Sequence, residues 1–314
     1  MIAVQTEELV KVFGKFSALN GLELMVEEGT IFGFLGPNGA GKTTSIRILT
    51  GLAHATSGKA WVLGNLIGSS KDPIAKQIGF LPEEPAFYTW MTPLEFLDYV
   101  GRIFGLPSAE RDARSKELLQ LAGLEDSAKR RIGGFSRGMR QRLALAQALI
   151  NRPRVLFLDE PASALDPVGR KEVLGFIEQL RGQCTVFMST HILADVERVC
   201  DTVGIINHGK LVTQAPREAL LAQYAVPALE VEVDDHSKND VMSWIESLRN
   251  MPWVKVISHD APTLRVIVND IELAKKELLT SAVQAGIVFN KYEVVRPSLE
   301  DVFMQLVGEE EIKQ

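Results

Sequence analysis

One segment near the N-terminus has the residue types and the spacing of a phosphate-binding loop. It follows the pattern G-x-x-x-x-G-K-[ST] through Gly36, Pro37, Asn38, Gly39, Ala40, Gly41, Lys42 and Thr43. Glycines let backbone N–H groups turn toward phosphate oxygens, and a helix that follows points its N-terminus at the same anion. We expect Lys42 to reach the β- and γ-phosphates of a nucleotide and Thr43 to ligate Mg²⁺, with Thr44 in the same nucleotide site. The alternative is a glycine turn that precedes a helix by chance, but such a turn would not also have Lys42 and Thr43 at the positions that the pattern requires.

Two adjacent carboxylates follow much later in the chain. Residues 155–158 (Val-Leu-Phe-Leu) are an apolar strand pattern that ends in Asp159 and Glu160. Beside a bound nucleotide, Asp159 can hold Mg²⁺ through water, and Glu160 can orient the attacking water. Taken alone, the pair could be a solvated strand end, but a phosphate-binding loop in the same chain favours a catalytic role. The sequence therefore predicts a site that hydrolyses MgATP.

These motifs need a frame of strand, loop and helix, and the sequence supplies one. Residues 31–35 are a short apolar run typical of a buried strand, and a helical pattern from about 42 to 51 follows the loop. Further strands are expected at 2–12, 19–26, 155–158, 185–188 and 203–206, with helical stretches between the last three. Alternating buried strands and helices indicate an α/β domain with a largely parallel sheet.

A mostly helical segment lies between the two motifs, from about 85 to 150. Helical spacing is clearest at 110–122 and 137–150. Thr92 is expected to cap a helix that has Pro93 and an acidic residue in its first turn.

The pattern changes near Pro216 and Pro227, and we expect domains at 1–215 and 228–314 with a linker at 216–227. The second domain is predicted to have the order β-α-β-β-α-β, at 229–233, 239–249, 253–259, 263–268, 271–285 and 287–295. This is the order of a small α+β ferredoxin-like domain. A last short helix is expected to begin at residues 297–300 (Pro-Ser-Leu-Glu).

The second domain has no recognisable catalytic constellation. His236 and His259 lack the spacing of metal ligands. We favour a role in packing or in dimer stabilisation, and regulation by a ligand or partner is the alternative.

Composition sets limits on the class of protein. The chain has 314 residues, 46% of them hydrophobic, and a formal net charge of -6, which suits about two globular domains and gives no bulk attraction for nucleic acid. Cys184 and Cys200 lie among apolar residues and are expected to be reduced thiols of a cytosolic protein. The N-terminus is not of the signal-peptide type, and no run approaches the ~20 apolar residues that span a bilayer. Any membrane-spanning part is therefore expected in another chain.

Taken in order, the motifs of residues 2–215 resemble those of the nucleotide-binding subunit of an ATP-binding cassette (ABC) transporter. The resemblance implies a P-loop NTPase core with an N-terminal antiparallel β part and a helical insert. Residues 135–143 (Phe-Ser-Arg-Gly-Met-Arg-Gln-Arg-Leu) look like the family's signature segment, in which Ser136 and Gly138 would cap the γ-phosphate bound by a partner subunit. Residues 163–166 (Ser-Ala-Leu-Asp) look like the D-loop and bring Asp166 into the nucleotide site.

Three further positions take their roles from this resemblance. His191, after the strand at 185–188, looks like the switch histidine, and Phe13 stands where the family places an aromatic ring that stacks on adenine. Outside this context, the first would be a structural histidine and the second a core residue. Glu83 falls at the family's Q-loop glutamine, which puts a negative charge beside the phosphates and leaves contact with Mg²⁺ open.

The signature segment also departs from the commonest family pattern, Leu-Ser-Gly-Gly-Gln, because Arg137 replaces a glycine and Met139 replaces the glutamine. Such variants, together with a C-terminal extension, are similar to a bacterial exporter-type branch that serves drugs, antimicrobial peptides or sodium. The substrate, the direction of transport and the choice between homodimer and heterodimer stay open.

The resemblance implies a mechanism. Two chains sandwich two ATP molecules head to tail, Lys42 and Mg²⁺ neutralise phosphate charge, Glu160 positions water, and His191 steadies the γ-phosphate. The protein would sit peripherally on the cytoplasmic side of the cell membrane and drive a separate permease, which we expect to insert a short helix near Glu83, Phe87, Tyr88 and Trp90.

Three other interpretations are weaker. Soluble ABC proteins of ribosomes generally carry two cassettes in one chain, and those of DNA repair insert a long coiled coil; this sequence has neither. A regulatory module that binds ATP without turnover would not need Lys42, Glu160 and His191 together. A nucleotide kinase or GTPase would leave the signature and D-loop unexplained.

Overall fold

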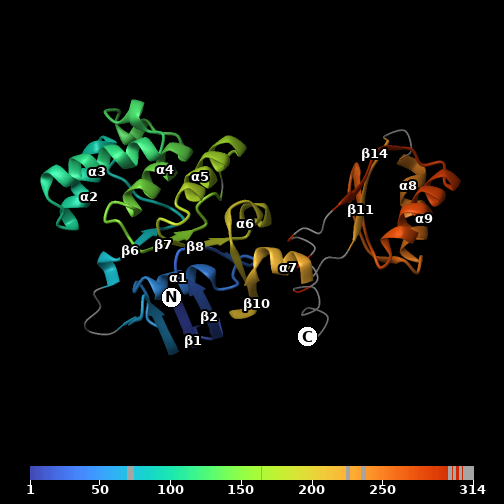
Figure 1. Ribbon diagram of the computed structural model, residues 1–314, viewed down its shortest axis with the longest axis horizontal. Coiled ribbons are helices and arrows are strands. Elements are labelled where there is room, and N and C mark those ends of the chain that lie inside the picture. The colour runs from blue at the N-terminus through green and yellow to red at the C-terminus, as the bar shows by residue number, and fades with distance from the viewer. Residues whose placement is uncertain are drawn as a thin grey trace. The chain divides into compact units, whose positions relative to one another are not determined.

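The computed structural model describes residues 1–68, 74–163, 165–223, 227–234, 238–295, 299, 302, 303 and 306. The chain divides into two compact units, Met1–Arg217 and Glu218–Gln314 (Figure 1). The segment 216–227, expected to be a linker, contains the helix α7 (Arg217–Gln223). Residues 224–226 of that segment lie outside the described residues.

An antiparallel sheet forms the N-terminal part of the first unit, in agreement with the predicted fold. Its strands, in the order β2-β1-β4-β5, are β2 (Phe16–Glu27), β1 (Ile2–Phe13), β4 (Ser57–Val62) and β5 (Asn65–Leu66). The long hairpin of β1 and β2 pairs Val4 with Val26 and Phe13 with Phe16. Strand β4 was not predicted, because Ser57, Gly58 and Lys59 are exposed and interrupt the apolar alternation.

A six-stranded sheet carries the predicted motifs. Its strands, in spatial order, are β10 (Lys210–Pro216), β9 (Thr202–Asn207), β3 (Ile31–Leu35), β8 (Thr185–Thr190), β7 (Val155–Asp159) and β6 (Ile78–Leu81). Five are parallel, and β10 pairs antiparallel at one edge. The register sets Leu35 beside Thr190 and Asp159 beside Ser189. The carboxyl ends of β3, β7 and β8 therefore meet at one edge, the place where α/β sheets bind ligands.

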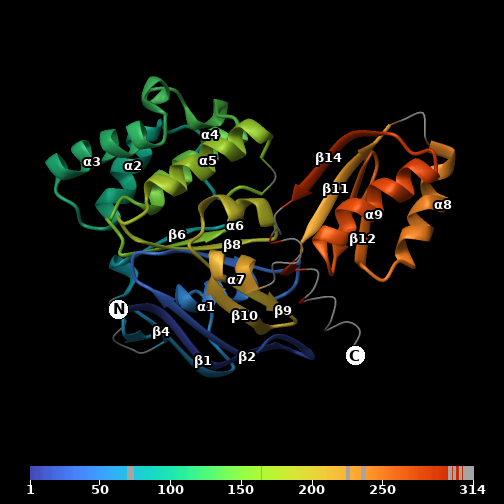
Figure 2. The same cartoon turned by 45° about the vertical axis from the view of Figure 1, so that its right-hand side comes forward.

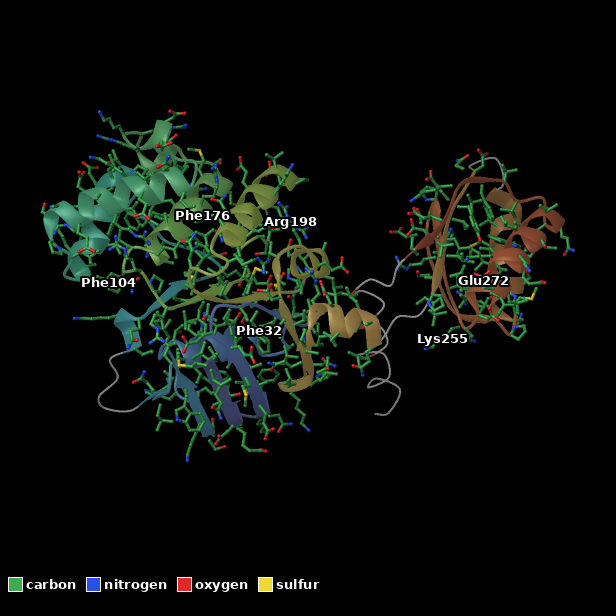
Figure 3. The ribbon with its side chains drawn as sticks, in the orientation of Figure 1. Phe32, Phe104, Phe176, Arg198, Lys255 and Glu272 are labelled. Atoms are coloured by element: carbon green, nitrogen blue, oxygen red, sulfur yellow. The ribbon has the colours of Figure 1, made fainter. Side chains whose placement is uncertain are left out.

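The helix α1 (Lys42–Leu49) lies between the two sheets, and α4 (Arg137–Ala148) and α5 (Pro167–Gln179) lie on the other side of the six-stranded sheet (Figure 1). The core of this layer includes Phe32 and Phe34 of β3, whose rings contact Phe187 of β8 at centroid distances of 5.1 Å and 5.3 Å. Phe32, labelled in Figure 3, lies in the interior of the unit. Burial of each such ring stabilises the fold by roughly 1.5–3 kcal/mol. The packed layer therefore holds the strand before the loop and the helix after the loop in fixed positions.

Helices of the first unit lie both inside the segment predicted to be mostly helical, about 85–150, and after it. These helical elements are α2 (Pro93–Ile103), α3 (Ser108–Leu121), α4 (Arg137–Ala148), α5 (Pro167–Gln179), α6 (Leu193–Val199) and short 3-10 turns at Ile74–Lys76, Glu125–Ser127 and Ile132–Gly134. Thr92 caps α2 as predicted, since its hydroxyl accepts from the Glu95 N–H and the Glu95 carboxylate accepts from the Thr92 N–H.

The second unit has the predicted β-α-β-β-α-β order. Its elements are β11 (Ala228–Val233), α8 (Lys238–Arg249), β12 (Val254–Asp260), β13 (Thr263–Val268), α9 (Ile271–Gln284) and β14 (Phe289–Val295). The strand order β12-β13-β11-β14 is wholly antiparallel, and both helices cover one face (Figure 2). Trp244 of α8 donates its indole N–H to Ser281 of α9 at 2.9 Å. His236 and residues 297, 298 and 300 of the last predicted helix lie outside the described residues, whereas Leu299 is buried.

Two observations bear on the environment of the chain. Within the part that the structure describes, no helix has the length and apolar character needed to cross a bilayer. Cys184 and Cys200 are free and buried. Burial raises the pKa of the Cys184 thiol to about 11 and raises that of Cys200 as well, so both thiols are protonated at neutral pH.

Candidate active site

The phosphate-binding loop connects β3 to α1, and its backbone requires glycine. A Cβ on Gly36 would lie 2.4 Å from the Ile206 carbonyl oxygen. Gly41 has φ 110, and a Cβ there would lie 2.6 Å from the Ala18 carbonyl oxygen. The first turn of α1 has neither a side-chain cap nor an acidic residue. Its N–H groups are therefore available to an anion that enters the loop.

Lys42 is buried at the base of this loop, with 6% of its side chain exposed. Its ammonium donates to the carbonyl oxygens of Gly36 at 2.7 Å and Pro37 at 3.2 Å. It also lies 3.3 Å from Glu160 Oε1. The carbonyls and the carboxylate hold the ammonium at the base of the loop, from where it can turn toward phosphate oxygens.

Asp159 ends strand β7 and is 2% exposed. Its Oδ1 accepts from the Thr43 hydroxyl at 3.1 Å and from the Ser189 hydroxyl at 2.7 Å. Thr43 and Asp159 were predicted as metal ligands, and the structure brings their oxygens together. Such hard oxygen donors are the ligands that Mg²⁺ prefers.

Glu160 follows in a strained backbone conformation, with φ 50 and 7% of its surface exposed. Its N–H donates to Ser189 Oγ at 3.0 Å, and its carbonyl accepts from the Ser163 hydroxyl at 3.0 Å. The carboxylate is shared, because Oε1 faces Lys42 and Oε2 lies 2.9 Å from His191 Nδ1. Hydrogen bonds to its N–H and to its carbonyl therefore hold Glu160 in the strained conformation, and this conformation sets the direction of the carboxylate.

A cleft of about 390 Å³ unites these groups. Its lining residues are Phe16, Ala18, Asn38, Gly39, Gly41, Lys42, Thr43, Thr44, Glu83, Glu160 and His191. Gly36, Pro37 and Ala40 belong to the loop but do not line the cleft. The Ala40 N–H donates to the Pro37 carbonyl at 3.2 Å and closes a turn of the loop.

Phe13, the predicted adenine-stacking residue, is not among the lining residues. It is 53% exposed, and Lys11 Nζ lies 4.8 Å from its ring centroid. Phe16, which pairs with it across the β1–β2 turn and is 60% exposed, lines the cleft instead. The sequence did not single out Phe16, because both aromatics flank the same tight turn, and adenine stacking by Phe13 stays a prediction.

Glu83 borders two hollows. It lines the nucleotide cleft and also a hollow of about 290 Å³ together with Glu84, Pro85, Arg137, Arg140 and Gln141. The negative charge that the sequence places beside the phosphates is thus also close to the positive charge of Arg137 at the start of α4.

The signature and D-loop residues lie outside the nucleotide cleft of their own chain. Ser136 caps α4, where its hydroxyl accepts from the Met139 N–H at 3.2 Å, and it is exposed. Asp166, also exposed, caps α5 by accepting from the Gly169 N–H at 2.8 Å. Gly138 packs against Gly169, since a Cβ on Gly138 would lie 3.6 Å from the Gly169 Cα. Ala164 of the predicted D-loop lies outside the described residues.

Two family models match the chain. The ABC transporter model matches residues 19–163, and the model for the C-terminal domain of DrrA1-3-like ATP-binding proteins matches residues 216–307. Among curated proteins, the uncharacterized ABC transporter ATP-binding protein YxlF of Bacillus subtilis is 39% identical over 302 residues, which are 96% of this chain and 98% of that protein. The bacitracin transport ATP-binding protein BcrA of Bacillus licheniformis is 36% identical over 307 residues, which are 97% of each.

A solved structure extends the similarity to the assembled form of a cassette. It is a dimeric post-hydrolysis state of an ATP-binding cassette bound to ADP and Pi, and it is 25% identical with a TM-score of 0.61. The match covers 68% of this chain and 98% of that chain.

Proposed function

Because this chain belongs to the family of ABC transporter ATP-binding proteins, we propose that two copies of it close head to tail on two MgATP molecules and drive a separate membrane permease, as an exporter. As a member of this family the chain is an ATPase. The observation that carries the proposal is the division of its site residues. Lys42, Glu160 and His191 share one cleft, whereas Ser136 and Asp166 are exposed outside it.

The exposed residues suit a site completed by a second copy. Ser136 stands at the N-terminus of α4, where its O–H remains a donor while its oxygen caps the helix. Gly138, in the first turn, keeps side chains away from an approaching phosphate. In a head-to-tail pair, each chain offers these groups to the γ-phosphate held by its partner. The dimeric relative bound to ADP and Pi supports this arrangement.

Positive charge in the cleft comes from this chain and from a metal. Lys42 exchanges its carbonyl acceptors for the β- and γ-phosphate oxygens. Thr43 would ligate Mg²⁺ directly and Asp159 would hold it through water, since their oxygens are 3.1 Å apart. Bound there, the ion supplies charge that neutralises the phosphates. Glu83 lines the same cleft and is the nearest candidate for a further water-mediated contact.

Glu160 is the group proposed to position the attacking water. Its Oε1 faces Lys42, and once Lys42 turns to phosphate that oxygen is free to accept a hydrogen bond from water. His191 holds Oε2 at 2.9 Å and directs its other ring nitrogen away from Glu160. Since Nδ1 donates to the carboxylate, that second nitrogen is a donor in the imidazolium form, in which it can steady the γ-phosphate as charge shifts during its transfer.

A permease is proposed to dock near the loop before α2. Tyr88, Trp90 and Tyr99 are 41%, 64% and 40% exposed, and the Tyr88 ring contacts both of the others at 5.1 Å and 5.8 Å. Phe87 packs on Phe96 of α2 at 5.1 Å and anchors the loop instead of facing outward. Exposed, clustered aromatics are typical of interaction surfaces. Docking there would hold the protein on the cytoplasmic face of the membrane.

The second unit is proposed to be a packing or dimer-stabilising module. A hollow of about 310 Å³ in this unit lies among residues that include Glu232, Met242 and His259, and these form no recognisable catalytic set.

Turnover and its metal dependence test the catalytic part. We would measure phosphate release from MgATP by the purified chain, by Lys42→Ala and Glu160→Gln variants, and by a Lys59→Ala control, whose lysine is exposed on β4. The first two variants should lose at least about 100-fold in kcat/KM, the control should match the wild type, and EDTA should stop all turnover. A Glu160→Gln variant that releases phosphate at the wild-type rate contradicts the assigned role.

Docking is tested separately in cells that carry the permease. Tyr88→Ala and Trp90→Ala should abolish transport while the purified chains keep their ATPase activity. If both variants still support transport, the proposed docking surface is wrong.

A further inference from the structure

One buried charge next to the active site has no role in the mechanism above. Asp195 on α6 is 2% exposed, and its Oδ1 accepts from Arg170 Nε on α5 at 2.6 Å. Arg170 is less buried, with 30% of its side chain exposed. A carboxylate enclosed this completely needs a partner, and Arg170 supplies it.

Asp195 ends the segment that carries His191. The Thr190 hydroxyl accepts from the Ile192 N–H at 3.0 Å, and the Ile192 carbonyl accepts from the Asp195 N–H at 3.2 Å. His191 thus lies on a short bonded segment that is fixed at one end by β8 and at the other by Asp195. Its Nδ1 is 2.9 Å from Glu160 Oε2, so a shift of this segment would move the catalytic carboxylate as well.

Arg170 belongs to the first turn of α5. Its N–H donates to the Asp166 carbonyl at 2.9 Å, and Gly169 in the same turn packs against Gly138 of the signature segment. The ion pair therefore joins two surfaces of one chain. One surface holds His191 and Glu160 for the chain's own nucleotide, and the other presents Ser136 and Gly138 to a partner's nucleotide.

Stability does not account for this pair. Burial raises the pKa of Asp195, and the hydrogen bond and charge of Arg170 oppose that effect without overcoming it, while nearby Glu160 raises the pKa and His191 lowers it. A carboxyl group whose pKa is higher in the folded than in the unfolded state favours folding below the unfolded pKa and loses that effect as pH rises through the folded pKa. Ionisation of the buried Asp195 therefore adds nothing to the stability of the fold, which is compatible with a role of the pair in positioning.

We propose that Asp195, held by Arg170, is a positioning residue that fixes His191 against Glu160 and ties it to the first turn of α5. The inference rests on the proposed catalytic role of His191. It adds that α5 links the hydrolytic groups of one nucleotide site to the signature residues of the other. Nucleotide affinity should be nearly independent of the pair, because Lys42 and the loop backbone bind phosphate without it.

The test is steady-state ATPase kinetics of Asp195→Asn and Arg170→Gln. Each should lower kcat about tenfold and change KM for MgATP by less than about twofold. Arg170→Lys keeps a cation beside Asp195 and should recover part of the loss. Glu28→Gln is the matched control, because it breaks another ion pair of the same unit, to Arg154 at 3.0 Å, and should leave kcat unchanged. Thermal unfolding should show that each variant is folded at the assay temperature, although Arg170→Gln, which leaves Asp195 buried without its partner, should have a lower midpoint than the wild type.

A double variant separates positioning from mere support of the fold. If Asp195 acts through His191, adding Asp195→Asn to His191→Ala should cause no further loss of kcat. Independent, multiplying losses would overturn the inference, as would wild-type kcat in Asp195→Asn. Wild-type kcat in His191→Ala would instead refute the assigned role of His191. A reduced kcat in His191→Ala with an unchanged kcat in Asp195→Asn would refute the positioning role alone.

Discussion

Ser189→Ala removes one hydroxyl that supports both carboxylates of the active site. Ser189 lies in β8 and is fully buried. Its Oγ donates to Asp159 Oδ1 at 2.7 Å and accepts from the Glu160 N–H at 3.0 Å. Among the described residues that N–H, which belongs to the residue with φ 50, has no other hydrogen-bond acceptor. The variant therefore leaves a buried donor unpaired and loosens the strained turn.

The expected cost follows from these two bonds. An unsatisfied buried N–H costs about 1–3 kcal/mol, and a lost hydrogen bond to a charged group about 1.5–3 kcal/mol. Partial relaxation reduces the sum, so we expect the free energy of unfolding to fall by about 2–4 kcal/mol. For a unit of this length, Met1–Arg217, that corresponds to a fall of roughly 5–15 °C in Tm. Because the Glu160 N–H loses its acceptor and the carboxylate is positioned less well, kcat should fall about tenfold or more.

Differential scanning calorimetry and phosphate release would measure both effects. Ser115→Ala is the matched control, since Ser115 is 2% exposed and its hydroxyl has no hydrogen-bond partner among the described residues. Removing that hydroxyl should be neutral or slightly stabilising. If Ser189→Ala unfolds at the same temperature as Ser115→Ala and keeps wild-type kcat, the support assigned to Ser189 is refuted.

Three other predictions concern the cleft and the thiols. Phe16→Ala should weaken ATP binding by about 1–3 kcal/mol of binding free energy, because the stacking of its ring on adenine is lost. Phe13→Ala should have a smaller effect. Equal effects of the two variants in a fluorescent-nucleotide titration would contradict the choice of Phe16. Glu83→Gln removes a negative charge from the cleft and should lower the Kd for MgATP severalfold at low salt, which corresponds to about 1 kcal/mol of binding free energy. If the variant instead binds MgATP more weakly, Glu83 contributes to binding the water shell of the metal. Cys184, whose pKa is about 11, and Cys200 should not react with a thiol reagent at pH 8 until guanidinium unfolds the protein; rapid modification of the native chain would contradict their burial.

Sequence alone predicts those parts of the site that come from continuous motifs. The order of strand, glycine loop and helix at 31–51 fixes where Lys42 and Thr43 lie, because the loop has little freedom between β3 and α1. Parallel pairing then brings the ends of β3, β7 and β8 together, which is how distant Asp159 and His191 reach the same edge. The second unit was equally predictable, since its alternation of strands and helices is regular.

What sequence did not predict depends on tertiary neighbours. Ser189 is an ordinary serine in a buried strand, and only its register beside Asp159 makes it part of the site. Phe13 and Phe16 are both candidates for stacking on adenine, and the sequence does not show that Phe16 is the one that lines the cleft. The pair of Arg170 and Asp195 was invisible for the same reason, because the two residues lie on different helices. Helix α7 begins at Arg217, within the expected linker, because the residues after Pro216 favour a helix and a proline just before the first turn does not interrupt one.

The mass of the Glu160→Gln variant in solution, with and without MgATP, tests the composite site most directly. Because this variant is expected to bind ATP without hydrolysing it, MgATP should raise its mass from 34.6 kDa to twice that value. Adding Ser136→Arg to the same chain should keep ATP binding and abolish the dimer. If the Glu160→Gln variant binds MgATP and stays at 34.6 kDa, two copies of this chain do not form the proposed sandwich.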